Sequence, residues 1–342
     1  MKPNSRKNLV ILFCIIIFAS FCVLSGLVID FFFFLNRPPG SSIEQKEIDI
    51  APGTNLDKIS NLLFREGVVS SGLKFKYYVL FKGVAGKLKA GKYRFSTYMT
   101  PRDVLEKLLQ GEIILKKITI PEGLTVKQVA RLMARYGLGT FEQIMKVMQD
   151  QEFIKELGIN APSLEGYLFP DTYFYSSSQN FRDLIKAMVD EFNKHFEEIW
   201  ANRSPDNPLT RHEVLILASM IEKEAMVDDE RPIIAGVFIN RLKKGMLLQC
   251  DPTVIYGLKN FNGNLTKKDL NTKTPYNTYM VKGLPPGPIC NPGPASLKAA
   301  ANPAKVKYLY FVSKNDGHHF FSETIREHIN AVRQYQMKRK KP

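Results

Sequence analysis

The sequence predicts an α+β protein with a transmembrane helix at its N-terminus. Three observations lead to this prediction: a long apolar run near the N-terminus, short alternating strand patterns followed by amphipathic helices, and a series of helical patterns in the second half. We divide the chain into five segments. They are a tail at 1–8, a transmembrane helix at 9–35, a small α/β module at 44–115, a mixed α+β domain at 116–337 and a basic tail at 338–342.

The run Leu9–Ile29 is nearly all apolar. As a helix it would span roughly 31 Å, which matches a hydrocarbon core of about 30 Å. Asp30 ends the run, and the phenylalanines at 31–34 would lie near the far interface. A cleaved signal peptide is the alternative, but the run is long and no A-x-A-like site follows it. Three basic residues before the run keep the N-terminus in the cytoplasm and export the rest: Lys2, Arg6 and Lys7.

The charge and the cysteines limit the class of partner. The formal net charge is +15, which suits anionic partners. No RNA- or DNA-binding motif is present, so no nucleic acid is expected. Outside a membrane, anionic lipid headgroups or acidic wall polymers are the expected partners, and a solvated basic surface is the alternative. Cys250 and Cys290 lie in the exported part, where a disulfide is permitted, and the sequence leaves their pairing open.

Two segments repeat at a spacing of 70 residues. Residues 48–67 and 118–137 each begin with alternating isoleucines and end at a glycine, with apolar residues in the same phase between them. Each copy predicts a short strand, a turn and an amphipathic helix. Between the copies, residues 92–95 predict a strand, and the Thr-Pro pair at 100–101 predicts the start of a helix.

The second half predicts three helices, a long loop, a strand pair and a last helix. Helices are predicted where apolar residues recur at helical spacing, with Asp228 or Asp229 as the cap of the third. Strands are predicted where apolar and polar residues alternate. The loop is rich in Gly, Pro and Asn, and so long a loop in a compact domain is usually functional. In order, these elements cover residues 181–200, 214–221, 233–238, 250–294, 307–312, 319–321 and 323–337.

A single carboxylate stands among apolar residues in the segment 163–173. Glu165 has Leu164, Tyr167, Leu168 and Phe169 as its neighbours in the sequence. Burial against apolar side chains disfavours the charged form of a carboxylate and therefore raises its pKa. An acid with a raised pKa can hold its proton near neutral pH and donate it to a leaving group. A loop carboxylate that caps a backbone amide is the alternative.

Several other kinds of site are disfavoured. Residues 86–92 resemble the front of a phosphate-binding loop, but Tyr93 stands where Ser or Thr would bind magnesium. The sequence has no H-E-x-x-H, and His318 and His319 would point to opposite faces of a strand. No G-x-S-x-G elbow is present. We therefore expect no metal and no other cofactor.

Two carboxylates follow the helical pattern at 214–221. Glu222 and Glu224 are two residues apart, so on a helix they diverge by about 200° and only one can face a site. Glu222 follows the apolar face more closely and is the better candidate for an inward role, although both could be surface charges. Further on, amides and hydroxyls stand beside aromatic rings, as sugar binding requires. These segments are 240–241, 248–256, 274–279 and 283–293.

The segment Leu164-Glu-Gly-Tyr-Leu-Phe-Pro-Asp-Thr-Tyr173 resembles the catalytic segment of the membrane-anchored endolytic murein transglycosylases, the MltG or YceG-like family. The resemblance covers essentially the whole chain, because several long motifs occur in the order of that family. Cys250 and Cys290 stand where some relatives have Thr, Ser or Ala. The further motifs are Ala218–Glu224, Val237–Leu242, Gln249–Gly257, Tyr276–Tyr279, Gly283–Gly287, Asn291–Gly293 and Tyr308–Phe311.

The resemblance implies a fold and a reaction. Residues 44–115 would be a LysM-like module, and residues 116–337 would be a YceG-like catalytic domain. Glu165 would protonate the glycosidic oxygen between N-acetylmuramic acid and N-acetylglucosamine. As a carboxylate it would then take the proton of the C6 hydroxyl that closes a 1,6-anhydro ring. We infer that the substrate-binding residues are Tyr167, Asp171, Glu222, Asn240, Gln249, Asp251, Tyr276 and Asn277.

The implied protein is a lyase that spans the bacterial inner membrane once, with its catalytic domain outside the cytoplasm. Its partners would be nascent peptidoglycan strands and peptidoglycan synthases. Two alternatives stay open: a non-catalytic peptidoglycan-binding scaffold, and a muramidase that uses water with Asp171 or Glu222 as a second carboxylate. Asp171 follows Pro170 and can also serve only to hold the turn.

Overall fold

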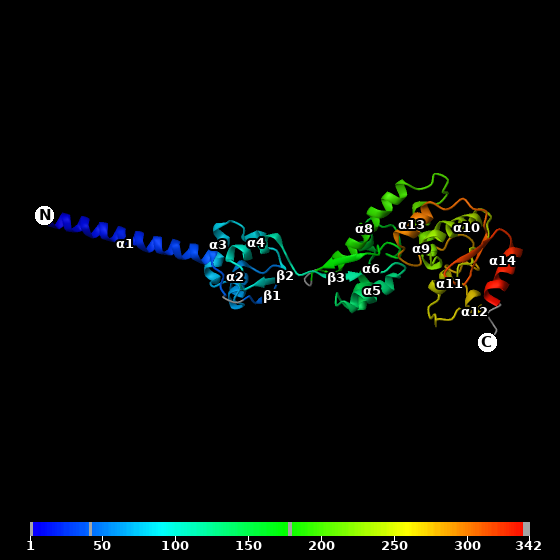
Figure 1. The fold of residues 1–342 in the computed structure, drawn as a ribbon, viewed down its shortest axis with the longest axis horizontal. Helices are drawn as coiled ribbons and strands as arrows, with labels where there is room; N and C mark the ends of the chain where they lie inside the picture. Colours follow the sequence, from blue (N-terminus) through cyan, green and yellow to red (C-terminus); the bar gives the residue numbers. More distant parts are fainter. Residues whose placement is uncertain (1–2, 41–42, 177–179, 338–342) are drawn as a thin grey trace. The chain divides into compact units, whose positions relative to one another are not determined.

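The computed structural model describes residues 3–40, 43–176 and 180–337. The predicted basic tail at 338–342 and the first two residues of the predicted N-terminal tail lie outside the described residues. The chain forms two compact units, one of Met1–Lys116 with Phe174–Gln179 and one of Lys117–Tyr173 with Asn180–Pro342 (Figure 1). Helices together with short two-stranded sheets confirm the α+β class.

One helix, α1 (Pro3–Asn36), is apolar enough over Leu9–Asn36 to cross a membrane by length and composition. Its apolar side chains are exposed up to Phe33 except for Phe31, which packs partly buried against the core of the first unit, and Phe34 and Leu35 are buried in that core. The predicted apolar helix is therefore confirmed as a helix. Its position in a membrane stays a prediction.

The rest of the first unit is a two-stranded antiparallel sheet with three helices. Alternation along the strands turns one set of side chains into the core. Ile48 lies opposite Tyr93 in this register, and both are buried. The order is strand, helix, helix, strand, helix, and the LysM-like assignment stays a prediction. The elements are β1 (Gln45–Ile50), α2 (Leu56–Arg65), α3 (Gly72–Phe81), the 3-10 turn η1 (Ala85–Lys87), β2 (Gly91–Ser96) and α4 (Pro101–Gln110).

The repeat of 70 residues is present in the structure. Helix α5 (Val126–Arg135) begins and ends 70 residues after α2. The side chains of Asn55 and Thr125 accept a backbone N–H in the first turn of α2 and α5, respectively. Gly67 and Gly137 follow the two helices with φ of 70° and 74°, a conformation that favours glycine. Local sequence therefore determines where both helices begin and end.

The second unit is mostly helical and is built around α9 (Arg211–Glu224). Residues 214–221 of α9 are all buried, because α10, α11 and α13 pack against this helix. The buried helix therefore positions the neighbouring loops of this unit. The remaining elements are β3 (Lys116–Thr119), α6 (Phe141–Met148), α7 (Gln151–Glu156), β4 (Thr172–Tyr175), α8 (Phe181–Ala201), η2 (Asp228–Glu230), α10 (Arg231–Lys243), α11 (Asp251–Gly257), α12 (Lys267–Leu270), α13 (Pro294–Ala301), β5 (Tyr310–Ser313), β6 (His319–Ser322), α14 (Ile325–Val332) and η3 (Arg333–Met337).

The predicted helices and strands of the second half differ from the structure mainly at their ends. The predicted loop at 250–294 is wrong in part, because it contains the helices α11 and α12. The strand predicted from residue 307 starts at Tyr310, because only β5 pairs with β6. The last helix is α-helical to Val332 and continues as a π-helical turn. The predicted cap by Asp228 or Asp229 is wrong: both residues form the 3-10 turn η2, and α10 begins at Arg231 without a side-chain cap.

Gly236 of α10 provides a test of this packing. A Cβ at this position would overlap the carbonyl oxygen of Ala304 and would lie 2.8 Å from Cγ2 of Val306. We expect Gly236→Ala to lower the free energy of unfolding by about 2 kcal/mol, because a backbone carbonyl cannot move aside as a flexible side chain can. Denaturant unfolding measures this loss.

Gly86 is the matched control, because a Cβ there meets open space. Gly86→Ala should change the free energy of unfolding by less than about 0.5 kcal/mol. Equal stabilities of the two variants would contradict the close approach at α10.

Candidate functional site

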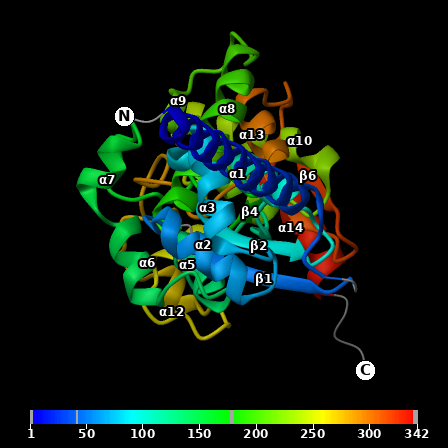
Figure 2. The same cartoon turned by 90° about the vertical axis from the view of Figure 1, so that its left-hand side faces the viewer.

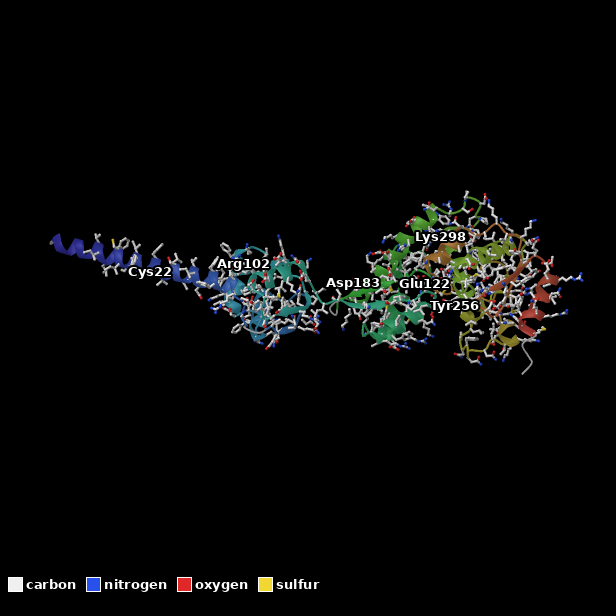
Figure 3. All side chains as sticks on the ribbon, viewed as in Figure 1. Cys22, Arg102, Glu122, Asp183, Tyr256 and Lys298 are labelled. Atoms are coloured by element: carbon white, nitrogen blue, oxygen red, sulfur yellow. The ribbon has the colours of Figure 1, made fainter. Side chains whose placement is uncertain are left out.

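Glu165 lies in the loop between α7 and β4, and it is buried with 6 % of its surface exposed. Its two carboxylate oxygens accept separate hydrogen bonds. The backbone N–H of Val126, at the start of α5, donates to Oε1 at 3.0 Å. The hydroxyl of Tyr256 on α11 donates to Oε2 at 3.0 Å; Figure 3 labels Tyr256 among the side chains of this unit.

Close packing and the side-chain amide of Asn291 hold the Glu165 loop in place. Gly166 has φ of 89°, and a Cβ there would lie 2.7 Å from Pro288. Asn291 accepts the N–H of Leu168 at 2.9 Å and donates from Nδ2 to the carbonyl oxygen of Leu124 at 2.7 Å. The buried Asn291 therefore joins the Glu165 loop to the turn that precedes α5.

Burial raises the pKa of Glu165 to about 7, while the hydrogen bonds from Val126 and Tyr256 act in the opposite direction. The positive end of the α5 dipole also favours the carboxylate form. Tyr276 packs on Tyr256 with ring centroids 4.8 Å apart, and burial raises the pKa of its phenol. The apolar environment that the sequence predicted for Glu165 is thus present, but hydrogen-bond donors occupy both oxygens.

A second acid, Glu224, lies at the C-terminal end of a helix, whereas Glu165 lies at the N-terminal end of α5. Glu224 is the last residue of α9, and it lines a cavity of about 430 Å³. Burial of the carboxyl raises the pKa of Glu224 to about 7, and a hydrogen bond from the Cys250 thiol opposes the rise. The negative end of the α9 dipole disfavours the carboxylate form, in contrast to the situation at Glu165.

The same cavity contains two of the predicted substrate-binding residues. Gln249 and Asp251 are exposed and line it together with Glu224. The hydroxyl of Tyr279 donates to Asp251 Oδ1 at 2.5 Å. Arg241 forms another part of the wall, where its guanidinium is held by the carbonyl oxygens of Leu309 and Leu248. Acidic, amide, hydroxyl and cationic groups therefore surround one opening.

His319 adds an ordered imidazole to this cavity. Its Nδ1 lies 2.7 Å from Glu230 Oε2, and its backbone N–H donates to Glu230 Oε1 at 2.8 Å. Its ring also packs at right angles to Phe311, with centroids 5.4 Å apart. The buried carboxylate fixes the orientation of the ring.

Three other predicted substrate-binding residues have their polar groups occupied within the protein. Glu222 accepts hydrogen bonds from Ser296 Oγ at 2.7 Å and from the Gly293 N–H at 3.1 Å, and it lies 3.5 Å from Arg231. The amides of Asn240 and Asn277 each donate to two backbone carbonyl oxygens. The structure thus brings Glu224, and not Glu222, to the cavity wall.

The remaining predicted residues lie elsewhere in the unit. Asp171 is exposed and accepts the N–H of Thr172 at 2.6 Å, while its carbonyl oxygen accepts the N–H of Ile120 at 2.9 Å. Tyr167 bonds to His212 Nδ1 at 3.1 Å and lines a different cavity, of about 630 Å³. Tyr276 packs beside Tyr256, as described above.

Sequence reasoning missed the role of Glu224 in forming the cavity. A helical pattern could have found it, because Glu224 stands three residues after Ile221 and seven after Leu217, on one face of α9. Within the described residues no group of three or more His, Cys, Asp or Glu side chains could hold a metal ion. Cys250 and Cys290 are buried free thiols, which answers the question that the sequence left open.

The mixed α+β unit with its two carboxylic acids of raised pKa has relatives among known proteins. The sequence matches the model of the YceG-like family over residues 48–334, and the chain belongs to this family. The resemblance inferred from the motifs is thereby confirmed.

Named relatives and a solved structure agree with this assignment. The endolytic murein transglycosylase of Bacillus subtilis (strain 168) is 36 % identical over 304 residues, which are 84 % of each chain. That of Streptococcus pneumoniae serotype 2 (strain D39 / NCTC 7466) is 31 % identical over 321 residues, and the match covers 84 % of this chain but 58 % of the longer relative. The crystal structure of a putative yceG-like protein from Listeria monocytogenes is 35 % identical, with a TM-score of 0.58, and the match covers 84 % of this chain and 99 % of that one.

The raised pKa of Glu165 predicts a pH-dependent stability. Because its pKa is about 7 in the folded state against 4.5 unfolded, the folded state binds the extra proton between these values, and stability falls as pH rises through them. This loss amounts to about 3 kcal/mol at pH 8. We expect Glu165→Gln to remove it, so that the difference in unfolding free energy between pH 5 and pH 8 shrinks by about this amount.

Tyr256→Phe is the companion variant. It removes a hydrogen bond that lowers the pKa of Glu165, so the fall in stability should extend to higher pH than in the parent chain. Chemical denaturation at several pH values gives both curves. A Glu165→Gln curve parallel to that of the parent would show that this carboxyl is not desolvated.

Proposed function

We propose that this chain is an endolytic murein transglycosylase that cleaves the bond between N-acetylmuramic acid and N-acetylglucosamine in nascent glycan strands and leaves 1,6-anhydro ends. Membership of the YceG-like family supports the enzyme class, as do relatives with that name. The single observation behind the proposed mechanism is a buried carboxylic acid, Glu165, whose pKa is raised by burial to about 7.

Two carboxyls meet the first requirement of a general acid, a pKa near neutrality, and the second requirement is access to the substrate. Glu165 is the acid predicted from the sequence, but Val126 and Tyr256 bind its oxygens. Glu224 opens on the cavity that also contains Gln249 and Asp251. A carboxylate oxygen has two acceptor sites, so one hydrogen bond to each oxygen leaves Glu165 able to contact a substrate. We therefore propose Glu165 as the proton donor, and Glu224 is the second candidate.

The proposed reaction needs only one acid. The protonated carboxyl gives its proton to the glycosidic oxygen while the bond from that oxygen to C1 of the muramic residue breaks. The C6 hydroxyl of the same residue attacks C1, and the resulting carboxylate accepts the hydroxyl proton. Each cycle returns the acid to its starting state. Amides and hydroxyls around the cavity would bind the sugar edges, and Gln249 and Asp251 line this cavity together with Glu224.

We further propose that α1 anchors the chain in the inner membrane, with the N-terminus in the cytoplasm and both units outside. The apolar segment Leu9–Asn36 and the basic residues before it support this topology. The unit that contains β1 to α4 would be a LysM-like module. Peptidoglycan synthases would be neighbours, because the proposed substrate is the strand that they make.

The decisive experiment compares two variants on uncrosslinked glycan strands. Glu165→Gln should lower kcat/KM by about 10² to 10⁴, whereas Glu224→Gln should lower it less, because Glu224 would then only line the cavity. Glu198→Gln, at an exposed position on α8, is the matched control and should leave activity unchanged. Mass spectrometry of the products distinguishes anhydro ends from free reducing ends.

Each outcome of this experiment has a meaning. Anhydro products that vanish only in Glu165→Gln support the assignment made here. Loss of products confined to Glu224→Gln would assign the role of acid to Glu224. Free reducing ends would indicate a muramidase that uses water, and intact strands with every chain would indicate a non-catalytic scaffold.

The pKa of about 7 for Glu165 also predicts a pH profile. The donor must be protonated in the free enzyme, so kcat/KM should fall tenfold per pH unit above about pH 7. Initial rates measured from pH 5 to pH 9 give the profile. A rate that stays constant to pH 9 would exclude an acid with this pKa as the donor.

A further inference from the structure

Helix α3 carries an apolar stripe that the first unit does not cover. Four of its ten residues are large, apolar and exposed, although the opposite side of the same helix is buried in the core. A helix of a water-soluble domain normally turns its apolar side inward and its polar side outward. The exposed fractions are 63 % for Leu73, 58 % for Tyr77, 48 % for Leu80 and 85 % for Phe81.

The spacing of these residues makes a continuous face. Residues 73, 77, 80 and 81 fall within about 100° of each other around a helix. Phe64 of α2 enlarges the face, because it is half exposed and its Cβ lies 3.3 Å from the Cβ position of Gly72. Lys74 and Lys76 flank the stripe on its two sides. Apolar side chains with lysines along both edges are typical of a helix that lies in a membrane interface.

The stripe lies close to the end of the apolar helix α1. Lys74 forms an ion pair with Asp30 at 2.6 Å, and its ammonium lies 5.7 Å from the centre of the Phe34 ring. Phe34 and Leu35 are buried in the same core as Phe75 of α3. Figure 1 shows α3 at the end of the unit where α1 joins it, and Figure 2 turns that end toward the viewer. Asp30 is also where the apolar run stops, so α3 begins at the level of the predicted bilayer surface.

The stretch of chain that carries the stripe contains basic but no acidic residues. Residues 67–102 contain eight Lys and Arg residues and no Asp or Glu. Asp30 and Asp57 from other segments pair with Lys74 and Lys76, but several other lysines on this stretch have exposed side chains. Lysines near a bilayer surface are attracted by anionic headgroups.

We propose that α3 docks on the surface of the bilayer that α1 spans, with Leu73, Tyr77, Leu80 and Phe81 inserted among anionic headgroups. This proposal rests on the membrane anchoring proposed above. The first unit is then held to the bilayer at two places, through α1 and through α3. The second attachment fixes the orientation of the unit on the membrane, because a single helix alone would leave the unit free to rotate.

A lipid surface fits the stripe better than a glycan strand. Sugars are bound by aromatic faces combined with amides and carboxylates that reach their hydroxyls. The stripe has aliphatic and aromatic groups flanked by lysines, and the nearby carboxylates of Asp30 and Asp57 are already ion-paired with these lysines. A bilayer interface accepts such a combination and requires no matching shape. Continuity with the membrane helix supplies the reason why this partner, rather than a protein, covers the stripe.

The test uses the full chain reconstituted in vesicles that contain anionic lipid. A polarity-sensitive fluorophore is attached at position 81, and in a second variant at position 77, after Cys14 and Cys22 have been replaced by alanine; Cys250 and Cys290 are buried. Lipids with a spin label near the headgroup quench a fluorophore that lies at the interface. Leu115, which is 52 % exposed and directly precedes β3, is the matched control position, and Phe33 of α1 reports insertion of the anchor.

We expect quenching at 81 and 77 to be at least threefold stronger than at 115, together with a blue shift of the emission. Quenching at 33 with none at 81 and 77 would overturn the proposal while the membrane anchor stands. No quenching at any position would overturn the anchor itself. An emission shift at 81 that responds to added glycan strands and not to spin-labelled lipid would assign the stripe to glycan instead. Cleavage of glycan by the labelled chains confirms that they are folded.

Discussion

The burial of α9 is the constraint on which the rest of the second unit depends. Its residues 214–221 are enclosed on all sides, so the helix cannot rotate without exposing apolar surface. Ser219 on this helix accepts the N–H of Ile289 at 3.0 Å, and its carbonyl oxygen accepts the thiol of Cys290 at 3.3 Å. The next residue, Asn291, holds the Glu165 loop. The same helix ends at Glu224, so one rigid element determines the position of both acids.

The two acids show how similar pKa values arise in different surroundings. Burial raises both to about 7. Glu165 lies at the positive end of α5 and accepts two hydrogen bonds, which favour its carboxylate form. Glu224 lies at the negative end of α9, which disfavours its carboxylate form, and it lines a cavity. A pKa alone therefore does not identify which of the two acids donates a proton.

Local patterns predicted much of the fold and only part of the site. The repeat, with its capped helices and terminal glycines, and the helix α8 depend on neighbouring residues, so the sequence was sufficient to find them. Asn240 and Asn277 look like ligand-binding amides in a polar segment, but their partners are backbone carbonyls, some of them far away in the sequence. Glu222 was preferred over Glu224 because the position of Arg231 and Ser296 could not be known before folding.

Cys250 shows how a single side chain can adjust the pKa of Glu224. Its thiol is buried and hydrogen-bonds to Glu224, and this bond favours the carboxylate. A thiol is a weak donor, whereas the hydroxyl of Thr or Ser at the same place would be a stronger one. The stronger donor would stabilise the carboxylate more and would lower the pKa of Glu224 further. A cysteine at this position therefore keeps more of Glu224 protonated near neutral pH.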